Sequence, residues 1–429
     1  MLNKFFGIDE FGSSVKQEIL AGVVSFFTIV YIIVVNASIL ADAGIPLEAG
    51  ILATVLTSFV GCFLMGFLGR SPIILVPGMG VNALFTYTIC GTMGLSWQEG
   101  LAVVFVSGIL FTVIAFTKLS SIISKAIPNS LKEAISVGIG LFLTFIGLQK
   151  GGIVEGSKTT FVALGDFSDP HVLVTLITLV VTVVLYARGV PANFLISLFI
   201  GSILAGFFGL VDFKDLKNSG IEFGSYTDVL GAMSFERVFD LAFWIAAFSL
   251  TMVIVFENIG LVHGFVTTIN RPDRYKRSLQ ANAISAITSG FFGTSPTVST
   301  AETSAGIAAG GRTGLTAVAT GLLFMGTLFF LPVVKIVPDS AVAPILILIG
   351  GLMIQGIQKI NLKDFTESFP SFLIIAFIPL TYSIVDGMAF GFILYPILKI
   401  VMKRRQEVAM PLYFIAGLFL INFIFHTLH

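Results

Sequence analysis

The chain has 429 residues, 56% of them hydrophobic and only 11% charged, and its mean hydropathy is +1.00. Because these values exceed those of ordinary soluble domains, they indicate a membrane protein with the lipid bilayer as its surroundings. Lysine and arginine (24) balance aspartate and glutamate (24), which argues against a nucleic-acid partner. Both cysteines, Cys62 and Cys90, lie in apolar segments, so we expect neither a disulfide nor a metal site, and no cofactor.

Apolar runs of spanning or near-spanning length divide the chain. In the first half they lie at about 17–41, 48–68, 97–117, 131–149, 171–187 and 190–210. In the second half they lie at about 241–263, 276–292, 313–331, 338–357, 370–384 and 385–402. Two interrupted runs, near 72–93 and 295–311, bring the predicted membrane segments to fourteen. A further run, 410–428, fits a span or an interfacial helix, and we assign 403–429 to a C-terminal tail helix.

The positive charges support this topology. With the N-terminus in the cytoplasm and the spans alternating, 18 of the 24 lysines and arginines fall on the inner side and 6 on the outer side. Cytoplasmic loops carry such an excess of basic residues. The sequence therefore predicts a multi-pass protein of the cell (inner) membrane with a cytoplasmic N-terminus.

The two halves of the chain repeat short motifs in the same order. Ser71-Pro72 matches Ser295-Pro296, and Ile127-Pro128-Asn129-Ser130 matches Val337-Pro338-Asp339-Ser340. Each repeat, 1–210 and 241–402, holds seven spans, and the polar stretch 211–240 connects them outside the cell. Because seven is odd, the copies must lie in opposite orientations, as in the inverted repeats of secondary transporters.

The interrupted stretches 71–82 and 295–306 are too short to cross a bilayer as helices. We interpret each as a short strand that leads into a half-helix at the middle of the membrane, in segments 3 and 10. Non-helical backbone survives at that depth only where protein shields it or where it lines a cavity. The predicted fold is thus an all-α polytopic membrane protein with two short strands, whose paired interruptions mark a binding site.

Two glutamates are the leading site candidates. Glu257 lies within an apolar run, where a carboxylate costs about 3 kcal/mol and usually serves function. Glu302 lies at the start of the second half-helix, and the equivalent position in the first repeat is Gly78. The alternatives are a buried hydrogen-bonded group that ties two helices together, for Glu257, and a plain helix cap, for Glu302.

These carboxylates suit a small, flat, polar solute, because they can accept hydrogen bonds from ring N–H groups. Asn82 offers both donor and acceptor atoms, although such a residue can also join helices. Phe256 can stack on a planar ring, although packing is the default for one of 43 phenylalanines. If Glu257 or Glu302 exchanges a proton as access alternates, uptake can be coupled to the proton gradient.

Several motifs resemble one transporter family. They are Pro77-Gly78-Met79-Gly80-Val81-Asn82, Ile127-Pro128-Asn129-Ser130-Leu131-Lys132, the run from Glu302 to Gly314, and the run from Pro379 to Gly387. Together with the first predicted helix, they resemble the nucleobase:cation symporter-2 (nucleobase–ascorbate transporter) permeases, in the AzgA-like adenine/guanine/hypoxanthine branch.

The resemblance implies a uracil-permease-like fold, with a core domain (spans 1–4 and 8–11) and a gate domain (spans 5–7 and 12–14). It implies proton-coupled import of purine nucleobases, no enzymatic activity, and a homodimer. The site residues that we carry forward are Asn82, Phe256, Glu257, Ala301, Glu302 and Thr303 for the substrate, with Glu257 and Glu302 for the proton.

One motif departs from the branch, which usually has Asp-x-x-Asp-Thr in segment 8 where this chain has Ile254-Val255-Phe256-Glu257-Asn258. The preferred base and the coupling ion, proton or sodium, therefore stay open. Alternatives are a carrier of uracil, xanthine or an anion of the SulP type. An integral-membrane enzyme would need clustered metal ligands or a nucleophile–base pair within the spans, and a channel would need a continuous polar pore.

Overall fold

The structure is a computed structural model that describes residues 2–211 and 224–428. It is a mostly helical, polytopic membrane fold. Within the described residues, eight helical stretches are long and apolar enough to cross a membrane: Val15–Asp42, Leu47–Gly69, Trp97–Phe116, Asn129–Lys150, Pro170–Ala187, Leu241–Thr268, Asp339–Lys359 and Ile384–Val401. Four shorter apolar helices accompany them, at Asn193–Phe207, Gly314–Phe330, Phe365–Thr381 and Met410–Ile421.

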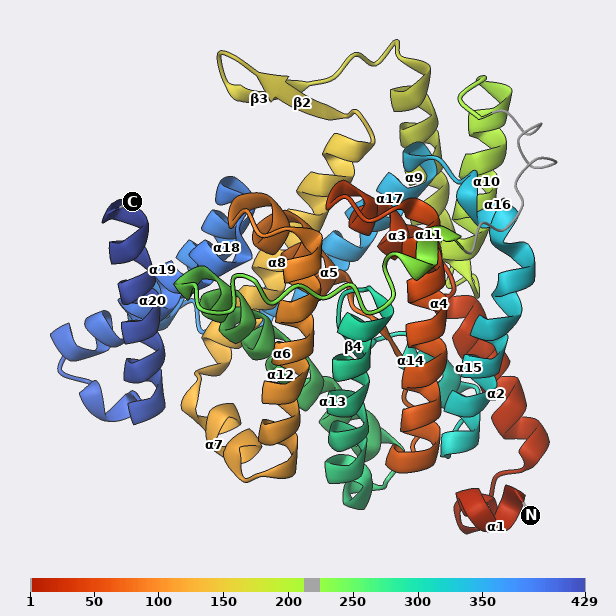
Figure 1. Cartoon of the computed structure of the whole chain (residues 1–429), viewed down its shortest axis with the longest axis horizontal. Coiled ribbons are helices and arrows are strands. Elements are labelled where there is room, and N and C mark those ends of the chain that lie inside the picture. The colour runs from red at the N-terminus through yellow and green to blue at the C-terminus, as the bar shows by residue number, and fades with distance from the viewer. Residues whose placement is uncertain (1, 212–223, 429) are drawn as a thin grey trace.

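The first half of the chain runs from the N-terminus to α10 (Figure 1). Its elements are α1 (Leu2–Phe6), η1 (Ile8–Phe11), α2 (Val15–Ile29), α3 (Ile32–Asp42), α4 (Leu47–Leu64), η2 (Met65–Gly69), β1 (Leu75–Pro77), α5 (Met79–Ala83), η3 (Leu84–Thr92), α6 (Trp97–Phe116), α7 (Leu119–Ala126), α8 (Asn129–Lys150), β2 (Val154–Ser157), β3 (Phe161–Leu164), α9 (Pro170–Ala187) and α10 (Asn193–Phe207).

The second half runs from α11 to α20. Its elements are α11 (Gly224–Thr227), α12 (Leu241–Thr268), η5 (Pro272–Arg274), α13 (Tyr275–Phe292), β4 (Thr297–Ser299), α14 (Thr303–Ala308), α15 (Gly314–Gly326), η6 (Thr327–Phe330), α16 (Leu331–Lys335), α17 (Asp339–Met353), η7 (Ile354–Lys359), α18 (Phe365–Thr381), α19 (Ile384–Val401), η8 (Arg405–Glu407) and α20 (Met410–Leu428). The predicted connection 211–240 lies partly outside the described residues.

Several boundaries differ from the predicted ones for local reasons. The predicted span 370–384 is α18, which begins earlier because the Asp364 side chain caps its N-terminus by accepting from the Thr366 N–H. The helix ends at Thr381, because the next residue, Tyr382, has a left-handed backbone (φ 57°). The predicted first span, 17–41, is interrupted after Ile29 by a turn that the apolar pattern did not reveal. An exposed hairpin, β2–β3, was also not predicted.

The helices pack in two groups. The first contains α2, α3, α4, α6, α12, α13 and α15, which surround β1, β4, α5 and α14. The second contains α8, α9, α10, α17, α18 and α19, and α20 packs on α19. Segments far apart in sequence meet in both groups, since α15 packs on α2 and α4, and α17 packs on α8 and α9.

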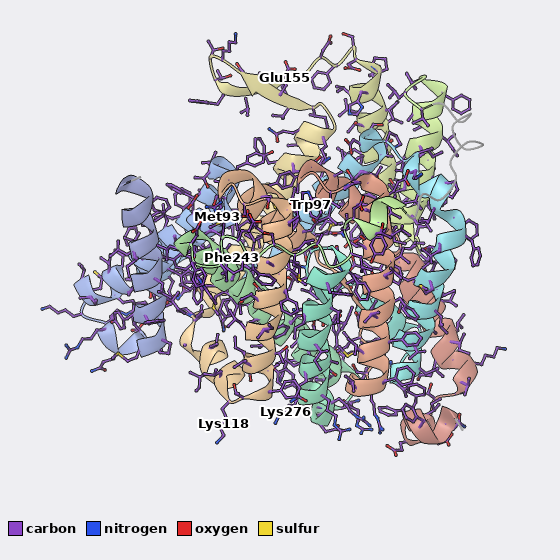
Figure 2. All side chains as sticks on the ribbon, in the orientation of Figure 1. Met93, Trp97, Lys118, Glu155, Phe243 and Lys276 are labelled. Atoms are coloured by element: carbon purple, nitrogen blue, oxygen red, sulfur yellow. The ribbon has the colours of Figure 1, made fainter. Side chains whose placement is uncertain are left out.

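The two ends of the helix bundle can be told apart by the residues that lie there. Lys118 and Lys276 lie at one end, the bottom of the view in Figure 2, and Glu155 of the β2–β3 hairpin lies at the other. The helix α1 lies at the Lys118 end as well (Figure 1). We call these the Lys118 end and the Glu155 end.

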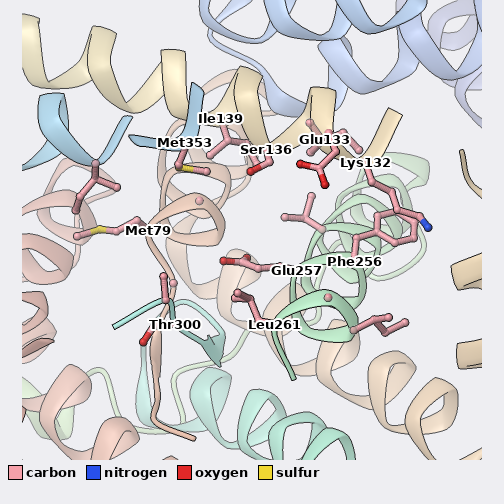
Figure 3. Close-up of a pocket in the computed structure, with 18 of the residues that line it drawn as sticks. Met79, Lys132, Glu133, Ser136, Ile139, Phe256, Glu257, Leu261, Thr300 and Met353 are labelled. Atoms are coloured by element: carbon pink, nitrogen blue, oxygen red, sulfur yellow. The ribbon is translucent and has the colours of Figure 1, made fainter. Parts of the chain in front are cut away.

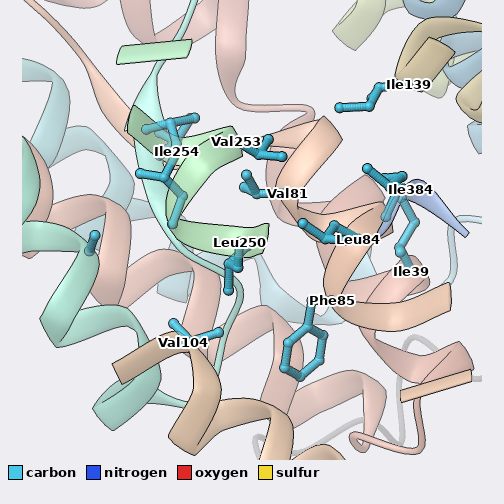
Figure 4. Packing of buried hydrophobic residues seen from close by; sticks show 14 of the residues in the cluster. Ile39, Val81, Leu84, Phe85, Val104, Ile139, Leu250, Val253, Ile254 and Ile384 are labelled. Atoms are coloured by element: carbon cyan, nitrogen blue, oxygen red, sulfur yellow. The ribbon is translucent and has the colours of Figure 1, made fainter. Parts of the chain in front are cut away.

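The apolar core surrounds the first half-helix. Val81, Leu84 and Phe85 are fully buried, and Leu250 and Val253 of α12 lie on the same cluster (Figure 4). This packing matters because α5 has only five residues, and a helix so short is not stable by its own hydrogen bonds. Tertiary contacts therefore hold it in place.

A buried carboxylate holds the end of the second half-helix. Glu18 of α2 is fully buried, and its side chain accepts hydrogen bonds from Arg312 N (3.1 Å), Thr313 N (3.0 Å) and Thr316 Oγ1 (2.6 Å). Arg312 and Thr313 lie in the link between α14 and α15, and Thr316 lies in the first turn of α15. The backbone N–H groups at the start of a helix lack helical partners. Glu18 thus ties α2 to the segment that follows α14.

We expect Glu18→Gln to destabilise the protein by about 2 kcal/mol, because an amide has one acceptor oxygen where the carboxylate has two, and its NH₂ group faces donors. Thermal unfolding of the purified protein in detergent measures this. The matched control is Glu155→Gln, at an exposed position of β2, which we expect to leave the melting temperature unchanged. Equal melting temperatures for wild type and Glu18→Gln would refute the role given to Glu18.

Candidate functional site

Two broken segments lie side by side at the centre of the first helix group. The first broken segment is β1 with α5 and η3, and the second is β4 with α14. Their strands pair antiparallel, with Leu75 opposite Ser299 and Pro77 opposite Thr297. Gly78 is required at the end of β1, because a Cβ there would lie 2.4 Å from Val298 Cγ2.

Side chains supply the partners that these short strands lack. Asn258 Oδ1 accepts from Ser299 N (2.8 Å), and Asn282 donates to Asn258 and to the Ser299 hydroxyl. Ser289 Oγ accepts from Thr297 N at 3.0 Å. Backbone N–H groups in the hydrocarbon region cost several kcal/mol when they are unsatisfied, so these bonds make the break in the helix tolerable.

A cavity of about 1040 Å³ lies where the two broken segments meet the second helix group. On one side it is lined by Gly78, Met79 and Gly80 of the first broken segment and by Thr300, Ala301 and Glu302 of the second. The opposite wall comes from α8 and α17, and α12 supplies the floor between them. We call it the central cavity.

The two glutamates predicted from the sequence both line this cavity. The carboxylate of Glu257 projects from α12 into the open space, toward the side on which Met79 lies (Figure 3). Glu302 is the residue directly before α14 and lines the same cavity. A flat ligand between them would meet two hydrogen-bond acceptors of negative charge.

The other predicted residues divide into two sets. Phe256 and Ala301 line the cavity with the glutamates. Asn82 and Thr303 are fully buried behind it and are not among its lining residues. Thr303 Oγ1 accepts from Ile74 N (3.2 Å), which joins the two broken segments. Neither amide atom of Asn82 has a hydrogen-bond partner within the described residues.

Other cavity residues were missed by sequence reasoning. Tyr31 lines the cavity and donates a hydrogen bond from its hydroxyl to Glu302 Oε1 (2.6 Å). Ser136 and Ile139 of α8 and Met353 of α17 form the wall opposite the half-helices (Figure 3). Tyr31 carries a weak signal, as a tyrosine in the middle of an apolar run, although the turn beside it carries none. The wall residues carry no signal of their own, because their role depends on how the two helix groups meet.

The cavity extends toward the Lys118 end of the bundle. Its lining includes Ser120 of α7, Lys132 and Glu133 of α8, and Lys359, whose ammonium lies 3.1 Å from Glu133 Oε1. Positive and negative side chains therefore both line the cavity toward this end.

Polar contacts join the two helix groups at the Glu155 end. Lys150 of α8 pairs with Asp42 of α3 (2.9 Å) and lies 3.6 Å from Asp339 of α17. Tyr87 of η3 donates to Asp42 (2.6 Å), and Ser38 donates to Asp339 (2.9 Å). We call this set the Lys150 bridge. It connects the helix groups on the side of the glutamates away from Ser120.

No group of three or more His, Cys, Asp or Glu that could hold a metal ion occurs among residues 2–211 and 224–428. The polar side chains that line the cavity offer hydrogen bonding and charge. Its apolar lining from Ile29, Ile32 and Phe256 can cover the faces of a ring, and its carboxylates can receive the N–H groups on the edge.

Known proteins match this sequence along most or all of its length. Residues 16–390 match the model of a permease family, Xan_ur_permease. The nucleobase transporter PlAzg2 of Paenibacillus larvae is 53% identical over 381 residues, which cover 89% of this chain and 76% of that protein. The adenine permease AdeP of Escherichia coli is 32% identical, and the match covers 100% of this chain and 97% of that protein.

Comparison of the structure supports the fold. The transmembrane domain of the cyanobacterial bicarbonate transporter BicA matches with a TM-score of 0.68 at 16% identity, covering 87% of this chain and 97% of that one. The murine anion transporter Slc26a9 matches with a TM-score of 0.68 at 13% identity, covering 90% and 68%. On the sequence evidence, which confirms the resemblance to nucleobase:cation symporter-2 permeases, this chain belongs to the permease family and is a transporter rather than an enzyme.

Proposed function

We propose that this protein is a secondary active transporter that imports purine nucleobases, such as adenine, guanine and hypoxanthine. The observation that carries the proposal is the pair of carboxylates, Glu257 and Glu302, on one cavity where two broken segments meet. The relatives support the substrate class, since they are named as nucleobase, adenine and guanine/hypoxanthine transporters.

The proposed binding mode follows from the chemistry of the base. Purine bases carry ring N–H groups, and adenine and guanine also carry an exocyclic amino group; the two carboxylates can accept hydrogen bonds from these donors, and the ring faces fit beside Phe256. Ala301 and the backbone at Thr303 would lie beside the base on the half-helix side, with Asn82 behind them. An anion of the bicarbonate or sulfate type is disfavoured, because both acidic side chains would repel it.

The proposed architecture is a fourteen-segment, seven-plus-seven inverted repeat, with repeats 1–210 and 241–402 and a C-terminal helix in 403–429. The first helix group would be the core domain and the second the gate domain. The paired strands β1 and β4, one from each repeat, support this plan. The resemblance to uracil permease adds the expectation of a homodimer.

The proposed orientation puts the Lys118 end in the cytoplasm and the protein in the cell (inner) membrane. Basic residues at that end support it, as does the position of α1 there. In this orientation the central cavity extends to the cytoplasm, and the Lys150 bridge closes the outer side. Transport would then require the gate domain to move against the core domain so that the bridge breaks.

Proton coupling is part of the proposal. A carboxyl at Glu257 or Glu302 that binds a proton with the base would lower the negative charge of the loaded site while access to it changes. No other cofactor is required. A proton uncoupler is expected to abolish accumulation of radiolabelled hypoxanthine above the external concentration, whereas removal of sodium should leave it intact. Sodium-dependent accumulation that resists the uncoupler would exclude proton symport.

Glu257→Gln and Glu302→Gln are each expected to weaken purine binding at least tenfold, because each replaces a charged acceptor of a ring N–H by a neutral amide. Equilibrium binding of radiolabelled adenine and hypoxanthine to the purified protein measures this. Glu133→Gln is the matched control, as Glu133 is a carboxylate of the same cavity that pairs with Lys359. If both site variants bound like wild type, the assignment of the site would be wrong.

Lys150→Gln is expected to favour the outward-open state, because it removes the charge that joins α8 to Asp42. The readout is thiol labelling of Ser136→Cys in a background lacking Cys62 and Cys90. A membrane-impermeant reagent should label the site from the cytoplasmic side only, and Lys150→Gln should add labelling from outside. The control Lys158→Gln, an exposed residue beyond β2, should add none. Unchanged labelling in Lys150→Gln would exclude the bridge as an outer gate.

A further inference from the structure

The first membrane helix, Val15–Asp42, tightens into a short turn beside the central cavity. Helix α2 ends at Ile29 and α3 begins at Ile32, with a turn at Val30 and Tyr31 between them. In this turn Ile33 N donates to Val30 O, and Val34 N donates to Tyr31 O, a tighter pattern than that of an α-helix. Such a turn in the middle of a helix often marks a functional position.

The turn directs the Tyr31 side chain at Glu302. The Tyr31 hydroxyl lies 2.6 Å from Glu302 Oε1, a short, charge-assisted hydrogen bond when the carboxylate is ionised. Tyr31 itself is 1% exposed, so water does not compete for the hydroxyl.

Packing fixes both partners of this bond. The Tyr31 ring contacts Phe194 of α10, with ring centroids 4.8 Å apart. On the other side, α14 packs directly on α2, where a Cβ at Gly306 would lie 2.0 Å from Ser25 Oγ. The close approach at Gly306 sets the distance from α14 to the first membrane helix, and so keeps Glu302 within reach of Tyr31.

We propose that Tyr31 is a positioning residue for substrate binding: its hydroxyl holds Oε1 of Glu302 so that the other carboxylate oxygen faces the central cavity and accepts a ring N–H of the base. The proposal rests on the proposed function and deepens it. Without the hydroxyl, the Glu302 side chain would sample several rotamers, and the base would bear the entropy cost of fixing one.

The test is a double-mutant cycle of Tyr31→Phe with Glu302→Asp, read as dissociation constants for radiolabelled hypoxanthine and adenine. The phenylalanine ring keeps the packing on Phe194 and removes only the hydroxyl. Glu302→Asp keeps a carboxylate but shortens the side chain by one methylene, out of reach of Tyr31. Folding of every variant is checked by its thermal unfolding.

Tyr31→Phe alone is expected to weaken binding about tenfold, since hydrogen bonds to charged groups are among the stronger ones. In the E302D background, Tyr31→Phe is expected to weaken binding by less than twofold, because the bond is already lost. Tyr395→Phe is the matched control and should bind like wild type, because Tyr395 is a buried tyrosine that donates to a glutamate, Glu367, outside the central cavity.

Two results would overturn the proposal: wild-type affinity in Tyr31→Phe, or an equal loss of affinity in both backgrounds, which would mean that Tyr31 acts by packing alone. Glu302→Gln separates this failure from that of the proposed function. If Glu302→Gln weakens binding and Tyr31→Phe does not, only the role of Tyr31 is wrong. If neither variant changes purine binding, the binding site itself is wrong.

Discussion

The structure depends on one constraint: backbone N–H and C=O groups inside a membrane must find partners within the protein. A break in a membrane helix exposes such groups, and this chain has two breaks that meet. It satisfies them by pairing β1 with β4 and by placing polar side chains around the strands, among them Asn258, Asn282 and Ser289. The half-helices can then begin within the protein, with Gly78 and Glu302 on the cavity.

The same arrangement explains how Glu257 and Glu302 come to line the central cavity. The half-helix α14 begins directly after Glu302, and Glu257 lies on α12 beside the paired strands. The first helix group is held together by bonds such as those of Glu18 to the start of α15. The second helix group supplies a wall of the cavity, the contact of Phe194 with Tyr31, and the Lys150 bridge. A transporter needs this division, because the site must stay intact while access to it changes.

Much of the fold could be predicted from the sequence. The apolar runs predicted the eight helical stretches of the described residues that are long enough to span, because a membrane span has a fixed minimum length and few charges, and the count of fourteen segments stays a prediction. The lone carboxylates at Glu257 and Glu302 were identified because charge at that depth is costly, and both line the cavity. The interrupted stretches were recognised from their length and composition, and they contain the paired strands.

What could not be predicted depends on contacts between distant segments. The turn at Tyr31 leaves no mark in an apolar pattern, since tyrosine and isoleucine both fit a membrane helix. Asn82 and Thr303 are fully buried and are not among the residues that line the cavity, so their place at the substrate stays a prediction. Ser136 and Met353 became cavity residues only through the meeting of α8 and α17 with the half-helices.

The central claim is that a flat base binds between the two carboxylates at the crossing of the broken segments. An experimental structure of the protein with bound hypoxanthine tests this most directly. The account predicts ring density between Glu257 and Glu302, with ring nitrogen atoms within about 3.2 Å of both carboxylates. Density for the base elsewhere, or in this cavity but out of hydrogen-bond reach of both glutamates, would contradict it.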